Sequence, residues 1–144
     1  MKQRQLLVKT AILVSGFALA LSSLGAMASA MPAWQKQGDI NYVTGGLAKA
    51  DAAAIEHAAR YYPLQLEFLL EGKSQREHLS HVNVWIKDAK GKMVLDVTAD
   101  GPFLLARLPA GKYTISADLG GEVKSRVVRI VPQRHQRAVF KWQA

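Results

Sequence analysis

Apolar and polar residues alternate along most of the chain that follows Pro63. The segment LQLEFLL, residues 64–70, sets leucine or phenylalanine at every second position against glutamine and glutamate. A period of two puts successive side chains on opposite faces of an extended chain, so it predicts a β-strand with one buried face. The pattern predicts seven strands, at residues 64–70, 82–87, 93–98, 103–108, 113–119, 123–131 and 137–142.

Glycine, proline and aspartate mark the turns between these strands. DAKG at residues 88–91 has aspartate first and glycine last, as in a four-residue turn, and predicts a hairpin. DGP at residues 100–102 closes that hairpin, and PAGK at residues 109–112 predicts a tight turn. Gly120 and Gly121 mark the next turn. Turns about every 8 to 12 residues, with no helical pattern between them, favour a β-sandwich over a parallel sheet.

The alternation changes phase once, within residues 123–131. Val127 and Val128 are adjacent, whereas lysine and arginine alternate with other residues before and after them. We interpret this change of phase as a β-bulge, in which a strand carries one extra residue.

The pattern ahead of Pro63 is different. Residues 47–62 are rich in alanine and space their apolar residues three or four positions apart, which predicts one helix that Pro63 ends. Residues 31–46 have no sustained period, so we expect an extended or partly ordered arm, with a hinge or boundary at Gly45 and Gly46.

The first 30 residues have the features of a secretory signal peptide in their usual order. A basic start precedes an apolar stretch and the small residues Ala28-Ser29-Ala30, after which we expect cleavage. The apolar stretch is shorter than the roughly 18 to 20 residues of a membrane span, so we expect no transmembrane segment after cleavage. The predicted organisation is a signal peptide (1–30), an N-terminal arm and helix (31–62) and a β-sandwich (63–144), located in the periplasm.

Composition narrows the possible partners. Cysteine is absent, so the core must hold the fold without disulfides, although an exported chain meets an oxidising compartment. Three of the 19 basic residues leave with the signal peptide and all 11 acidic residues stay, which gives a net charge of +5. The excess lies late in the chain, at Lys124, Arg126, Arg129, Arg134, Arg137 and Lys141. Such a row suits an envelope protein, a glycan or an anionic lipid surface rather than nucleic acid, and the alternative is a solvated strand face.

A family resemblance rests on the segment FLLARLPAGKYTI, residues 103–115. It resembles the apolar strand, Leu-Pro-x-Gly-x-Tyr, apolar strand pattern of carboxypeptidase regulatory-like domains, which are transthyretin-like β-sandwiches. Residues 82–102 are similar to the paired strands and Asp-x-x-Gly turn of that family, and residues 42–68 to small exported bacterial proteins of this type. The resemblance covers residues 64–142.

The resemblance implies a mainly β fold, a seven-stranded transthyretin-like sandwich with one preceding helix. Domains of this family usually assist folding, anchoring or binding. The residues that carry the resemblance are turn and core residues, to which it assigns structural roles: Gly101, Pro102, Leu108, Pro109, Gly111 and Tyr113.

Nothing in the motif supplies a catalytic group. One transthyretin-like branch hydrolyses 5-hydroxyisourate with histidine and arginine residues and a C-terminal Tyr-Arg-Gly-Ser, whereas this chain ends in FKWQA. The sequence also has no Gly-x-Ser-x-Gly elbow and no paired carboxylates for acid–base work. We therefore expect an exported, non-catalytic binding or accessory module of the cell envelope, without a cofactor.

A few residues are candidates for binding. Trp34, Trp85 and Trp142 are candidates for lining a sugar-binding surface, but Trp142 ends a strand and is expected in the core. Of the three, only Trp85 is expected to be exposed enough to contact a ligand, together with Lys124, Arg126 and Arg129. His78 and His81 form the one close histidine pair, but their spacing puts them on opposite faces of a strand. A metal-binding or hydrolytic periplasmic protein that uses these two histidines is the alternative function.

Overall fold

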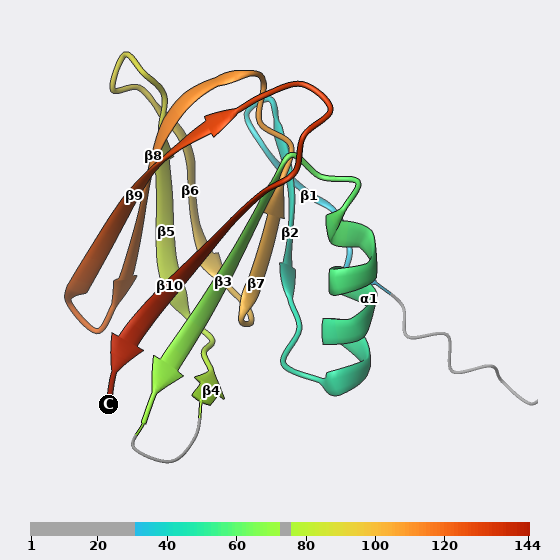
Figure 1. Ribbon diagram of the computed structural model, residues 1–144, viewed down its shortest axis with the longest axis vertical. Helices are drawn as coiled ribbons and strands as arrows, with labels where there is room; N and C mark the ends of the chain where they lie inside the picture. Colours follow the sequence, from blue (N-terminus) through green and yellow to red (C-terminus); the bar gives the residue numbers. More distant parts are fainter. Residues whose placement is uncertain (1–30, 73–75) are drawn as a thin grey trace, which may run out of the picture.

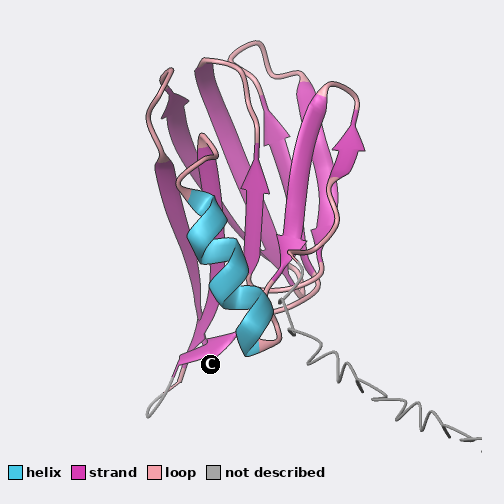
Figure 2. Cartoon of the chain, turned by 90° about the vertical axis from the view of Figure 1, so that its right-hand side faces the viewer, coloured by secondary structure: helices cyan, strands magenta, loops and turns pink. Residues whose placement is uncertain are grey.

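Two β-sheets face each other, and one helix lies on the outer side of one of them (Figures 1 and 2). The computed structural model describes residues 31–72 and 76–144, so the predicted signal peptide lies outside the described residues. The predicted mainly β sandwich with one helix is confirmed. Ten strands are described where we expected seven, because residues 35–45 and 76–78 also form strands.

Sheet A has the strand order β1-β2-β7-β3-β10, and the short strand β4 pairs with β3. Its strands are β1 (Gln35–Gln37), β2 (Ile40–Gly45), β3 (Leu64–Glu71), β4 (Arg76–His78), β7 (Phe103–Ala106) and β10 (Gln136–Gln143). β10 runs parallel to β3, whereas the other neighbouring strands are antiparallel. The last strand of the chain therefore lies beside the first strand that follows the helix.

Sheet B is antiparallel throughout, in the order β6-β5-β8-β9. Its strands are β5 (Val82–Lys87), β6 (Met93–Ala99), β8 (Gly111–Leu119) and β9 (Glu122–Ile130). The predicted turn between β5 and β6 is confirmed, since the side chain of Asp88 accepts hydrogen bonds from the backbone N–H groups of Lys90 and Lys92. The turn between β8 and β9 is also confirmed, with Asp118 accepting from the N–H of Gly121.

The main core lies between the two sheets and is built from alternate residues of their strands. Trp142 is 1% exposed, which confirms its predicted place in the core. It packs beside Phe68 and Phe140, with ring centres 6.5 and 6.4 Å away. Burial of one large apolar side chain contributes about 1.5–3 kcal/mol, so this core can stabilise a chain that has no disulfide.

Helix α1 (Lys49–Ala59) confirms the helix predicted from the alanine-rich segment. Ile55 and Ala59 face the outer side of β2 and β7 and form a second apolar cluster with Val43, Phe103 and Leu105. All four residues of β7 are consequently buried, because the strand has the main core on one face and the helix on the other. Among the residues that the structure describes, no helix has the length and apolar character needed to cross a membrane.

The segment expected to be an arm is part of the sandwich. β1 pairs with β2, and β2 pairs with β7, so strands of sheet A come from both sides of the boundary that we placed after Tyr62. Tyr42, Val43 and Thr44 are all buried. A strand buried on both faces needs no alternation of apolar and polar residues, which explains why the pattern did not reveal β2.

The bulge predicted at Val127 and Val128 is wrong. The register of β8 and β9 is continuous, from Gly111 opposite Ile130 to Leu119 opposite Glu122. β9 is an edge strand, so one of the two valines can be exposed: Val127 is 60% exposed and Val128 is half-buried. The register shift in sheet B instead lies between Ile86 and Lys87.

The segment 100–102 does not close a hairpin, because β6 and β7 belong to different sheets. It carries the chain from sheet B to sheet A, and Gly101 there packs directly on the backbone of Gly45. The segment 107–110 carries the chain back to sheet B. Its conformation is held by the hydroxyl of Tyr113, which donates a hydrogen bond to the carbonyl oxygen of Pro109 at 2.7 Å.

Candidate functional site

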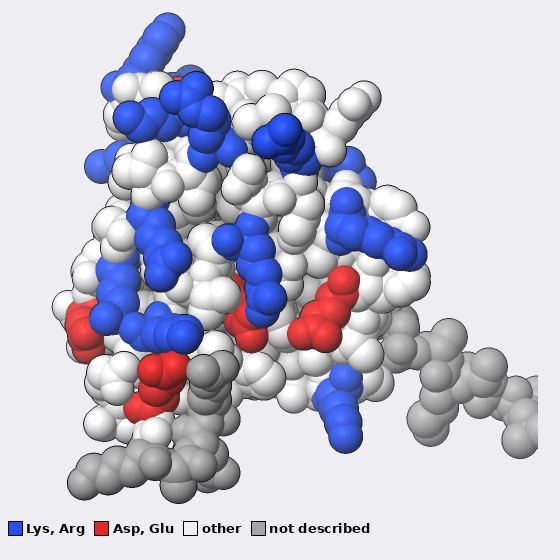
Figure 3. All heavy atoms as spheres, in the orientation of Figure 1, with Lys and Arg blue, Asp and Glu red and all other residues white. Residues whose placement is uncertain are grey.

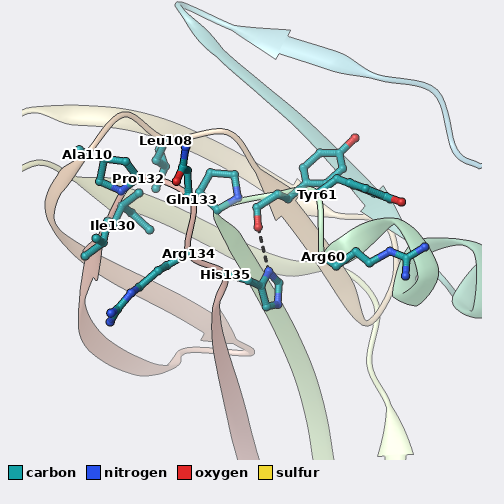
Figure 4. A pocket seen from close by; sticks show the side chains of 12 residues that line it. Arg60, Tyr61, Leu108, Ala110, Ile130, Pro132, Gln133, Arg134 and His135 are labelled. Carbon is teal, nitrogen blue, oxygen red and sulfur yellow. Dashed lines mark hydrogen bonds between the residues drawn. The ribbon is translucent and has the colours of Figure 1, made fainter.

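A pocket of about 420 Å³ lies at the end of the sandwich where the chain leaves α1 (Figure 4). Its lining comes from three segments: residues 60–63 after α1, residues 108 and 110 between β7 and β8, and residues 130–135 between β9 and β10. We call it the end pocket. Its volume lies in the range of about 300–1,000 Å³ in which proteins hold small ligands or parts of larger ones.

The lining of the end pocket combines apolar and basic side chains. Leu108, Ile130 and Pro132 supply apolar surface. Arg60 and Arg134 are exposed and extend outward from opposite sides of the pocket (Figure 4). The pocket therefore has a lining that is part apolar and part polar, with positive charges at its rim.

His135 fixes one wall of the end pocket. Its Nδ1 donates a hydrogen bond to the carbonyl oxygen of Tyr62 at 2.8 Å, drawn as the dashed line in Figure 4, and its Nε2 lies 3.1 Å from Oε1 of the buried Gln65. These contacts join the connection between β9 and β10 to the chain that follows α1. Because both ring nitrogens have protein partners, the imidazole serves here as a structural clip.

An aromatic stack adjoins the pocket at Tyr62. The ring of Trp34 lies on the ring of Tyr62, with centres 4.8 Å apart and planes at 16°. The guanidinium of Arg107 lies 4.8 Å from the centre of the Tyr62 ring and 5.6 Å from that of Trp34. Burial raises the pKa of the Tyr62 hydroxyl above its ordinary value of 10.0, and the charge of Arg107 opposes that rise. The hydroxyl is thus neutral at physiological pH.

No acidic side chain neutralises the arginines around this pocket. None of the ion pairs formed within residues 31–72 and 76–144 involves Arg60, Arg107 or Arg134. Arg60 instead contacts His57 and lies 4.9 Å from the ring centre of Tyr61. Positive charges without an acidic partner beside a hollow create a potential that attracts an anionic ligand.

The predicted row of basic residues divides between two faces of β9. The guanidinium of Arg126 lies 5.8 Å from the ring centre of the core residue Phe140, so Arg126 faces the inside of the sandwich. Lys124 shares that face and lies 3.6 Å from Glu122. Arg129 is an odd number of positions away and faces outward. The three residues predicted to bind together therefore form no common surface.

Three of the six late basic residues, Lys124, Arg137 and Lys141, have acidic partners among the described residues. Arg137 pairs with the buried Glu67, and Lys141 lies 3.3 Å from Glu71, both across the parallel strands β3 and β10. Figure 3 shows this mixture: acidic side chains lie mostly in the lower half of the view, whereas near the connection of β9 and β10 at the top the charged side chains are nearly all basic. Of the late basic row, Arg134 is the member that lines the end pocket.

The structure does not bring His78 and His81 to a shared partner. His78, in β4, lies 3.8 Å from the carboxylate of Glu67, whereas His81 precedes β5 in the other sheet and contacts Ser80. No group of three or more metal-ligating side chains occurs within the described part of the chain.

The exposed tryptophan is Trp34 rather than Trp85. Trp34 is 47% exposed, whereas Trp85 is half-buried on the outer face of sheet B, opposite Asp96 and Ser116 on the neighbouring strands. Sequence reasoning also missed Arg60, Tyr62 and Arg107. The available signal was the run Arg-Tyr-Tyr before Pro63, where two aromatic residues follow an arginine at the end of a helix.

Neither the family models nor the curated proteins compared with this chain include a match. Its function therefore has to follow from the chemistry of the end pocket and the residues around it.

Proposed function

We propose that the chain is a non-catalytic binding module of the cell envelope, whose end pocket receives a negatively charged group of its ligand. The observation that carries the proposal is the set of guanidinium groups without acidic partners around a hollow that contains no acidic residue. Arginine suits this role because its planar guanidinium donates paired hydrogen bonds to carboxylate or phosphate oxygens.

The lining of the pocket favours binding over catalysis. It contains no serine, cysteine, aspartate or glutamate, so it offers neither a common nucleophile nor a carboxylate base. His135 is the one histidine of the lining, and both of its ring nitrogens have protein partners. The pocket can hold and orient a ligand, which is the work of a binding or accessory module.

Export and fold type belong to the same proposal. The signal-peptide pattern supports export with cleavage after Ala30, and a periplasmic location brings the module to the anionic glycans and lipids of the envelope. The turn from Leu108 to Tyr113 supports a carboxypeptidase regulatory-like domain of the transthyretin-like type. Connections between strands commonly carry binding residues on a rigid scaffold, and the segment 131–135 has that place in this proposal.

The proposal is tested by removing charge at the pocket and, separately, from two residues of sheet B that do not line it. Arg60→Ser/Arg134→Ser removes two charges from the pocket. Lys112→Ser/Arg129→Ser removes two from exposed residues that lie opposite each other on β8 and β9. The probe is labelled inorganic polyphosphate, with binding followed by fluorescence anisotropy at about 0.1 M salt, where the Debye length is about 10 Å.

We expect the pocket variant to bind polyphosphate about tenfold more weakly than the control variant, a difference of about 1.4 kcal/mol. Equal affinities of the two variants would refute an anion site at the pocket, because net charge alone would then explain the binding. Melting temperatures within a few degrees of the unmodified chain establish that both variants are folded.

A further inference from the structure

We infer that the ligand of the end pocket is an acidic saccharide, with one sugar ring stacked on Trp34 and its carboxylate bound by Arg107. The inference rests on the proposed function, because it names the class of ligand for the same site. Its basis is the aromatic stack beside the pocket, which anion binding alone does not require.

The ring of Trp34 is a fixed and open platform. One face of the ring is covered by Tyr62, and Trp34 is still 47% exposed as a residue, which leaves ring surface away from Tyr62 open to a ligand. Tyr62 itself is 5% exposed and cannot move away. A ring held in this way loses little conformational freedom when a ligand stacks on it. The aromatic face is electron-rich and matches the C–H face of a sugar ring.

Arg107 places a positive charge at the edge of this platform. Its guanidinium is held against the rings of Tyr62 and Trp34, and its backbone N–H donates to the carbonyl oxygen of Asn41 at 2.9 Å. A guanidinium stacked on a ring keeps N–H groups at its edge for hydrogen bonds to a carboxylate. A sugar that carries a carboxylate therefore satisfies both the ring and the charge, which a neutral sugar does not.

The pairing of an arginine with an aromatic ring occurs again across the site. Arg60 lies 4.9 Å from the ring centre of Tyr61, which is 63% exposed. Tyr62 connects the two pairs, because it belongs to the Trp34 stack and also lines the pocket beside Tyr61. Two such pairs beside one pocket suit a chain of acidic sugar units, each of which offers one ring and one negative charge.

The concave shape of the pocket favours a saccharide over a flat membrane surface. Leu108, Ile130 and Pro132 belong to the pocket lining, and Leu108 and Ile130 are each 4% exposed. These two residues form the floor of the hollow, so a planar bilayer touches only the protruding groups at the rim, whereas a narrow oligomer extends into the hollow between them.

The experiment compares three probes on the chain without its signal peptide. A hexamer of 1,4-linked galacturonate has rings and charges, its methyl ester has rings without charges, and inorganic polyphosphate has charges without rings. Binding to the unmodified chain is compared with binding to Trp34→Ala, Trp34→Phe and, as a matched control on sheet B, Trp85→Ala. We expect Trp34→Ala to weaken galacturonate binding at least tenfold and to change polyphosphate binding less than twofold.

Further outcomes complete the test. Trp34→Phe keeps an aromatic face and should recover most of the galacturonate affinity, while Trp85→Ala should retain all of it. Unchanged galacturonate affinity in Trp34→Ala, or equal affinity for the acid and its methyl ester, overturns the inference. So does Trp34-dependent binding to phosphatidylglycerol vesicles without binding to galacturonate, which would identify a membrane surface. If Arg60→Ser/Arg134→Ser binds neither galacturonate nor polyphosphate, whereas Trp34→Ala still binds both, the saccharide inference fails and the proposed function stands.

Discussion

The side chain of Gln37 pairs with the backbone of Asp96 across the two sheets. Its Oε1 accepts the N–H of Asp96 at 2.6 Å, and its Nε2 donates to the carbonyl oxygen of the same residue at 2.9 Å. Gln37 ends β1 in sheet A, and Asp96 lies in β6, at the edge of sheet B. An amide side chain thus occupies backbone groups that a further strand would otherwise pair with. At the other side of the sandwich, Trp142 Nε1 donates to the carbonyl oxygen of Glu122 at 3.0 Å.

Replacing Gln37 with alanine should expose the edge of β6. We expect a loss of about 1 kcal/mol in the free energy of unfolding, since water replaces two hydrogen bonds at an exposed edge. We also expect more self-association at high concentration, measured by sedimentation velocity. Lys36→Ala is the control, because the side chain of Lys36 is exposed and takes part in none of these bonds. Identical association of the two variants would mean that Gln37 does not protect the edge.

Gly101→Ala should be among the most damaging single substitutions. A Cβ atom at this position would lie 2.4 Å from the carbonyl carbon and oxygen of Gly45, so the two segments would have to separate. We expect a loss of more than about 3 kcal/mol, measured by denaturant unfolding. Gly38→Ala is the comparison: its φ of +57° is strained for alanine but nothing lies within 4 Å, so it should cost only about 1–2 kcal/mol. Equal costs would argue against the close approach.

Tyr113 should make the fold sensitive to alkali. Burial, and then the negative charge of Asp88, raise the pKa of its hydroxyl above the ordinary value of 10.0. Above pH 10.0 the unfolded chain releases the phenolic proton more readily than the folded chain. The free energy of unfolding therefore falls as the pH rises through the raised pKa of the folded chain. Tyr113→Phe should lose about 1 kcal/mol at neutral pH, with the hydrogen bond to Pro109, and should show a shallower alkaline decline. An unchanged alkaline slope in urea titrations would disprove this role.

Glu67 should depend on Arg137 for its place in the fold. Glu67 is 6% exposed and pairs with Arg137 on the neighbouring strand. Arg137→Met leaves the buried carboxylate with only the more distant His78, 3.8 Å away, and should cost about 1–3 kcal/mol. The double variant Arg137→Met/Glu67→Gln also removes the negative charge of Glu67 and should recover part of the lost free energy of unfolding. If the double variant is less stable than Arg137→Met, the carboxylate is stabilised by another group.

Local chemistry explains which parts of the fold were predictable. The hairpin of β5 and β6 follows from Asp88 and Gly91, whose contacts lie within a few residues of each other. The parallel pairing of β10 with β3 joins residues about 70 positions apart, and only the packing of the whole sandwich selects it. The same reason applies to β2, because the helix that buries its second face comes later in the chain.

The end pocket was beyond sequence analysis for a related reason. Tyr62, Leu108 and His135 come from three separate connections, and no spacing in the sequence relates them. Trp34 was passed over because nothing in the sequence places it on Tyr62. The basic residues of β9 form a recognisable row in the sequence. The face of the sheet to which each belongs follows from the register of β9 with β8, and the adjacent pair Val127 and Val128 hides that register in the sequence pattern.

The most direct measurement is a map of the backbone amide shifts that the galacturonate hexamer causes in the ¹H–¹⁵N spectrum of the chain. If the end pocket and the Trp34 stack bind the ligand, the largest shifts will fall at Trp34, residues 60–62, Arg107 and residues 130–135, while residues 122–128 of β9 and the outer face of sheet B stay unchanged. Shifts confined to Lys124, Arg126 and Arg129, or to the surroundings of Trp85, would contradict that site and return the binding surface to sheet B.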